Sequence, residues 1–104
     1  MSEYRPDSEE LVTTDADEKP KEPPMFKVLL HNDDYTTMEF VVEILMFVFH
    51  KPVSDAMRIM LNVHRNGIGI CGAYAYEVAE TKVDTVHLLA KEGGFPLKCS
   101  MEEE

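Results

Sequence analysis

The chain has few basic residues, few cysteines and no long uninterrupted apolar run. Its 104 residues carry 10 lysines and arginines against 20 aspartates and glutamates, a formal net charge of -10. Nucleic acids and anionic membrane surfaces are bound through basic patches, so this charge argues against both as partners. It favours solubility and the attraction of cationic groups.

The two cysteines, Cys71 and Cys99, form no C-x-x-C motif and are too few for a disulfide scaffold. We interpret both as small apolar residues on strands. The longest apolar run, residues 40–49, is broken by Glu43 and is too short to span a bilayer. No basic stretch followed by an apolar core begins the chain, so we expect no signal peptide and a reduced, cytoplasmic protein.

The composition of the chain changes near residue 24. Residues 1–24 hold four of the six prolines and eight of the twenty acidic residues, against three basic ones. Such a segment cannot bury enough apolar surface to offset its ordering entropy, so we expect a disordered extension. Residues 25–104 are enough for one domain with a small core.

The globular part predicts six elements in the order β-α-α-β-α-β. Strands are expected over residues 26–31, 68–75 and 96–101, and helices over residues 37–49, 54–66 and 76–91. Thr36, followed three residues later by Glu39, forms a capping box that places the first helix start at Thr37. A three-stranded antiparallel sheet with three helices packed on one face is an α+β sandwich.

The first predicted helix is apolar almost all round, more than one stripe of an amphipathic helix requires. The surplus covers a subunit interface or a ligand pocket, or the helix is wedged between the sheet and the second helix. The second helix places Met57, Met60, Leu61 and His64 at helical spacing. Methionine suits a surface that accepts several side chains, although filling of the core is the alternative.

The segment between the first strand and the first helix is rich in acceptors: Asn32, Asp33 and Asp34. A negative rim beside an apolar wall could hold a small cation that carries an apolar group, such as the N-terminus of a peptide that begins with a bulky residue.

Two kinds of enzyme are alternatives to this binding role. His31, Asp33, Asp34 and His64 are possible metal ligands, but no H-x-x-x-H, C-x-x-C or complete calcium loop is present, so we expect no metal or other cofactor. Cys71 and His64 could serve a small hydrolase as nucleophile and base, although their spacing fixes no geometry. A purely structural interaction domain is a third interpretation.

Three segments carry a resemblance to a known family: FKVLLHNDDYTTMEFVVEIL, MLNVHRNGIGICGAYAYEVAETKV and PLKCS. They resemble the ClpS family, adaptors that hand N-degron substrates to the Clp AAA+ protease, over nearly all of residues 25–101. The resemblance implies a fold like the C-terminal domain of the ribosomal stalk protein, and a bacterial, monomeric adaptor without catalytic activity that modulates the choice of substrate. One departure is Thr37, where many relatives carry a proline that presets the first helical turn.

The resemblance also implies roles for individual residues. The α-amino group of the substrate would be bound by Asn32, Asp33, Asp34 and His64. The first side chain, Phe, Tyr, Trp or Leu, would enter a pocket lined by Thr36, Met38, Val41, Met60, Val63 and Leu97. Met38 would exclude β-branched residues. Glu77 and Lys82 would dock on the N-terminal domain of a ClpA-type unfoldase.

Overall fold

The computed structural model describes residues 23–104, so most of the extension expected over residues 1–24 lies outside the described part. The elements are β1 (Met25–His31), α2 (Met38–Phe47), α3 (Val53–Asn66), β2 (Ile68–Ala75), α4 (Tyr76–Gly93) and β3 (Lys98–Glu103). The predicted order β-α-α-β-α-β is therefore confirmed. No helix in the described part is long and apolar enough to cross a membrane.

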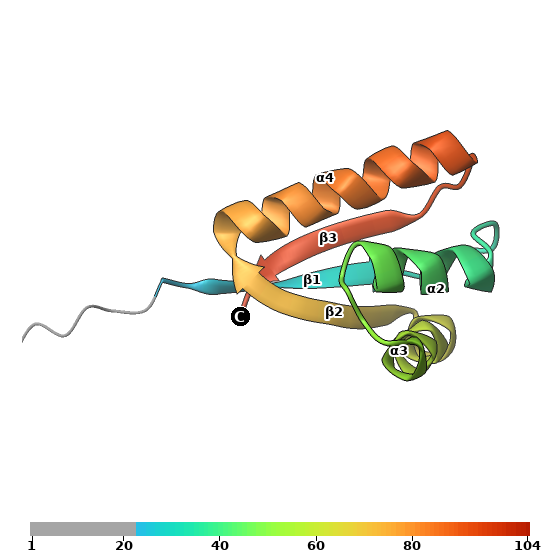
Figure 1. Cartoon of the computed structure of the whole chain (residues 1–104), viewed down its shortest axis with the longest axis horizontal. Coiled ribbons are helices and arrows are strands. Elements are labelled where there is room, and N and C mark those ends of the chain that lie inside the picture. Colours follow the sequence, from blue (N-terminus) through green and yellow to red (C-terminus); the bar gives the residue numbers. More distant parts are fainter. Residues whose placement is uncertain (1–22) are drawn as a thin grey trace, which may run out of the picture.

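The three strands form one antiparallel sheet, as predicted, and their order in it is β2-β1-β3. Central β1 is the most buried strand, because Val28, Leu29 and Leu30 are all buried there. Helix α4 lies along the sheet, whereas α2 and α3 gather at the end where β1 finishes and β2 begins (Figure 1). The end of β1 therefore delivers the following loop directly to the two shorter helices.

Helix α2 buries most of its apolar surplus in the common core. Val41, Ile44, Leu45 and Val48 follow helical spacing and are all buried, as expected of a helix wedged between other elements. Met38 and Phe47, at the two ends of the helix, are the exceptions and are 44% and 71% exposed.

The capping box expected at Thr36 is wrong by one residue. Helix α2 begins at Met38, and Thr37 is its N-cap, with a hydroxyl oxygen that accepts a 3.1 Å bond from the amide of Phe40. Thr36 does not cap the helix because its hydroxyl donates to the carboxylate of Asp33. Thr37 therefore caps the helix through its side chain and is not its first helical residue.

Other boundaries moved by one or two residues. Helix α2 ends at Phe47, α3 begins at Val53 after Pro52 as N-cap, and α4 continues to Gly93. The last strand runs over Lys98–Glu103, later than expected, because Lys98 is the residue that pairs with His31 at the end of β1.

Candidate functional site

The start of the loop after β1 is fixed against the end of α3. Gly67 ends α3 in the left-handed conformation, at φ 87°, which glycine adopts without steric cost. Its carbonyl accepts a 2.9 Å hydrogen bond from the amide of Asn32. This bond brings the loop of acceptors beside the last turn of α3, which carries His64.

Close packing of β2 against α3 positions the apolar side of the site. A Cβ atom at Gly69 would lie 2.6 Å from Cγ2 of Val63, so a larger residue would push this side chain aside. Met60, Val63 and His64 lie three and four residues apart and therefore share one face of α3.

Asp33 organises the loop itself. Its Oδ1 atom accepts hydrogen bonds of 2.7 Å from the amides of Tyr35 and Thr36, and its Oδ2 atom accepts one of 2.7 Å from the Thr36 hydroxyl. Burial alone would raise the pKa of Asp33, but these three donors outweigh it and hold the pKa below its usual value. The carboxylate is therefore ionised at neutral pH and fixed in place.

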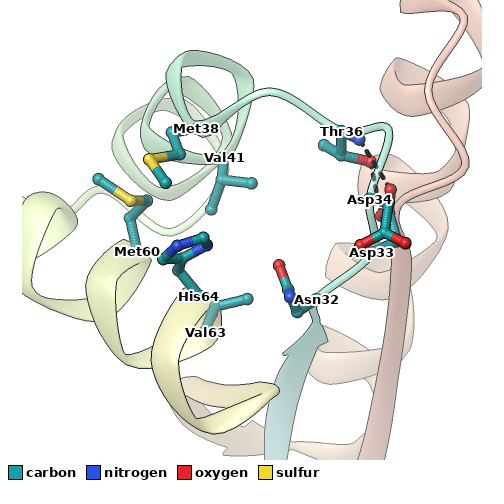
Figure 2. A pocket seen from close by; sticks show the side chains of 9 residues that line it. All are labelled: Asn32, Asp33, Asp34, Thr36, Met38, Val41, Met60, Val63 and His64. Atoms are coloured by element: carbon teal, nitrogen blue, oxygen red, sulfur yellow. Dashed lines mark hydrogen bonds between the residues drawn. The ribbon is translucent and has the colours of Figure 1, made fainter.

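These contacts enclose a cavity of about 260 Å³ between the loop, α2 and α3. Nine residues line it: Asn32, Asp33, Asp34, Thr36, Met38, Val41, Met60, Val63 and His64. Figure 2 shows Met38 and Met60 on one side and the two aspartates with Thr36 on the other, with Asn32 and His64 between them. The cavity thus has an acceptor-rich, negative end and an apolar end.

The structure brings together nine of the ten residues that the sequence assigned to substrate binding. The exception is Leu97, which is 4% exposed and belongs to the hydrophobic core, outside the cavity lining.

The two residues expected to contact an unfoldase lie outside the cavity and differ from each other. Glu77 is exposed in the first turn of α4. The ammonium of Lys82 donates a 2.7 Å hydrogen bond to the Val48 carbonyl and lies 5.7 Å and 5.2 Å from the ring centroids of Phe49 and Tyr74. Lys82 therefore holds the end of α2, a role that sequence reasoning missed.

The chemistry of a hydrolase or metalloenzyme finds little support in this geometry. Burial raises the pKa of the Cys71 thiol far above its usual range and that of Cys99 to about 12, so neither is a ready nucleophile. Within residues 23–104, no three side chains of His, Cys, Asp or Glu are grouped as a metal site requires.

Comparison with known proteins places this fold and cavity in a family. The family model of ATP-dependent Clp protease adaptor protein ClpS matches residues 21–100. ATP-dependent Clp protease adapter protein ClpS of Desulfatibacillum aliphaticivorans is 63% identical over 93 residues, 89% of each chain. The protein of the same name in Desulforapulum autotrophicum is 57% identical over 104 residues, the whole of both chains.

A solved structure shares the fold. Agrobacterium tumefaciens ClpS2 bound to L-phenylalaninamide superposes with a TM-score of 0.77 at 40% identity, covering 80% of this chain and 100% of the other. The arrangement of sheet and helices agrees with the sequence match over most of the chain, and we conclude that this protein belongs to the ClpS family of adaptors of the ATP-dependent Clp protease.

Proposed function

We propose that this adaptor binds the free α-amino group and the bulky first side chain of N-degron substrates, and delivers them to a Clp AAA+ unfoldase. The first side chain is Phe, Tyr, Trp or Leu. The adaptor does no chemistry itself and changes which substrates the protease degrades. The observation that carries this proposal is the cavity with acceptors at one end and an apolar surface at the other.

The acceptor-rich end suits an ammonium group. An α-amino group has a pKa of roughly 7.7–8.0, so it is mostly a cation at neutral pH, with three N–H donors. The amide oxygen of Asn32, the carboxylate of Asp33 and a neutral imidazole of His64 would accept them. Asp33 accepts three bonds within the loop, and a carboxylate has about four acceptor sites, so one site and the full charge are left. Asp34 adds negative potential.

The apolar end suits one bulky side chain. Met38, Val41, Met60 and Val63 would surround it, and burial of a large apolar side chain contributes roughly 1.5–3 kcal/mol. The Agrobacterium relative was solved with L-phenylalaninamide, which carries a free amine and a phenyl ring, the two groups that these two ends fit. Met38 would exclude β-branched residues, and Thr36 would edge the pocket.

The unfoldase would dock elsewhere on the molecule. Glu77 is exposed on α4, which contributes no residue to the cavity, so substrate and unfoldase could be held at the same time. We propose a ClpA-type N-terminal domain as the partner, with Glu77 and the accessible part of Lys82 at the contact. The adaptor would act in the cytoplasm as a monomer, with residues 1–24 as an extension of the domain formed by residues 25–104.

Calorimetry with matched peptides tests the binding role. A peptide that begins with Phe should bind with micromolar affinity, since three charge-assisted bonds of about 1.5–3 kcal/mol each and one buried side chain together reach the roughly 8 kcal/mol that this affinity requires. The N-acetylated peptide lacks the cation, and a peptide that begins with Val is β-branched, so neither should bind measurably. Equal binding of the free and acetylated peptides would refute the proposal.

A further inference from the structure

A second hollow of about 450 Å³ lies next to the cavity, between α2 and α3. It is lined by Met38, Glu39, Val42, Met57 and Met60, and we call it the methionine groove. Met38 and Met60 line both hollows, and Figure 2 shows them side by side. Their side chains therefore form the wall that the cavity and the groove share.

The groove exposes apolar surface to water, and the first residue of a substrate, held in the cavity, would not cover this surface. Met38 and Met57 are each 44% exposed, and Glu39 is the one charged residue of the lining. Exposed methionines are flexible and polarisable, so they can adapt to apolar groups of several shapes. The lining thus suits an apolar side chain that arrives beside an already occupied cavity.

We propose that the methionine groove binds an apolar side chain from the second or third residue of the substrate. This inference rests on the proposed function, because a first residue held in the cavity brings the next ones to the shared wall. Consecutive Cα atoms are about 3.8 Å apart, so both residues stay within two such steps of the cavity. The protein would then select its substrates on a short apolar N-terminal sequence and not on the first residue alone.

Three peptides of otherwise identical sequence test this inference by calorimetry: Phe-Ala-Ala, Phe-Leu-Ala and Phe-Ala-Leu at their N-termini. We expect at least one of the leucine peptides to bind about fivefold more tightly than Phe-Ala-Ala, because an open groove buries only part of a leucine side chain. Equal affinities of all three would overturn the inference.

Substitution of Met57 locates the effect, because this residue lines the groove and not the cavity. In Met57→Gln, which keeps an unbranched side chain of good helix propensity, the leucine peptides should lose their advantage. The ratio of their affinity to that of Phe-Ala-Ala should fall to about one. Leu88→Gln is the matched control, an exposed apolar residue on α4, and should keep the ratio of the unmodified protein. A ratio that survives in Met57→Gln would overturn the assignment to the groove.

Two further measurements distinguish failure of the groove from failure of the cavity and from self-association. If Phe-Ala-Ala binds no better than its N-acetylated form, the proposed function fails and the inference fails with it. If acetylation abolishes binding but leucine brings no gain, the inference alone fails. Sedimentation of the unmodified protein and of Met57→Gln tests whether a second copy of the chain occupies the groove. Self-association that the substitution removes would make the groove a contact between copies and would overturn a role in substrate binding.

Discussion

Polar side chains around the cavity are available to a ligand, whereas Lys82 and the two thiols, which lie outside the cavity, are committed to the fold. Asn32, Asp34 and His64 are exposed at the cavity. Elsewhere, the partly buried Lys82 donates to a backbone carbonyl and lies close to two aromatic rings, and Cys71 is buried as a neutral thiol. The type of a residue therefore does not decide its role; the decisive property is whether its charge or acceptors are left for another molecule.

Asp33 at the cavity has both kinds of task, and it is the most sensitive test of the comparison. It ties the loop together through three hydrogen bonds, and its carboxylate is also the charge proposed to meet the substrate. Changes at this residue should therefore cost more than changes at any side chain that has only one of these tasks.

The largest expected effect is that of Asp33→Ala. It removes the charge and all three loop contacts, so peptide affinity should fall by about a hundredfold, given about 1.5–3 kcal/mol for a bond to a charged group. Calorimetry with a peptide that begins with Phe measures the loss. Unchanged affinity would favour a purely structural interaction domain.

A second substitution at the same position separates the two tasks of this carboxylate. Asparagine keeps an oxygen that can accept the amide bonds of Tyr35 and Thr36 but lacks the charge. We expect Asp33→Asn to weaken binding by about tenfold, less than alanine does. If the two substitutions prove equal, the hydrogen bonds of the loop contribute nothing to binding.

Loss of the His64 side chain should weaken binding. A neutral imidazole can accept a hydrogen bond from an ammonium group, and alanine cannot. His64→Ala should bind a peptide that begins with Phe about tenfold more weakly by calorimetry, whereas His64→Gln, which keeps an acceptor, should show little change. An affinity that falls equally in both variants would show that an acceptor at this position does not contribute to binding.

Asp33 should keep its charge from pH 7 to pH 5.5. Its pKa is lowered, so the stability gained from its ionised form is complete above the ordinary value of about 3.9 and is lost only as the pH falls through the lowered pKa. The substrate amine is already mostly protonated at pH 7. Calorimetry at the two pH values should therefore show no loss of peptide affinity through this carboxylate.

The cavity was largely predictable from the sequence because its parts are local. Residues 32–38 follow one strand without interruption, and helical spacing puts Met60, Val63 and His64 on one face of α3. The family resemblance then joined the two halves. Their contact, the bond from the Asn32 amide to the Gly67 carbonyl, is between backbone groups and leaves no trace in residue types.

The sequence analysis erred or missed a role where a hydrogen bond to a distant residue, or a competition between two neighbouring residues, determines the local structure. Thr36 and Thr37 are both good caps, and the choice between them depended on Asp33, which occupies the hydroxyl of Thr36. Lys82 bonds a carbonyl 34 residues away, which no local pattern encodes. Leu97 precedes β3 and is buried in the core, outside the cavity lining, and its role at the pocket stays a prediction.

Lys82→Met should affect stability. Loss of the bond to the Val48 carbonyl should lower the free energy of unfolding by about 1 kcal/mol, or the melting temperature by roughly 5 °C. Lys98→Met, an exposed lysine on β3, is the control and should leave the melting temperature unchanged.

Glu77→Gln should weaken unfoldase binding without changing the melting temperature, so an effect on docking in this variant cannot be ascribed to a loosened fold.

The smallest expected effect is that of thiol modification. Cys71 and Cys99 are buried, and with its pKa near 12 only about one in ten thousand Cys99 side chains is a thiolate at pH 8. Iodoacetamide at that pH should leave the folded protein unmodified by mass and its peptide affinity unchanged, whereas the urea-unfolded protein should gain two adducts. Rapid modification of the folded chain would show an accessible thiolate and reopen the hydrolase hypothesis, because such a group would then stand among the available side chains and not the committed ones.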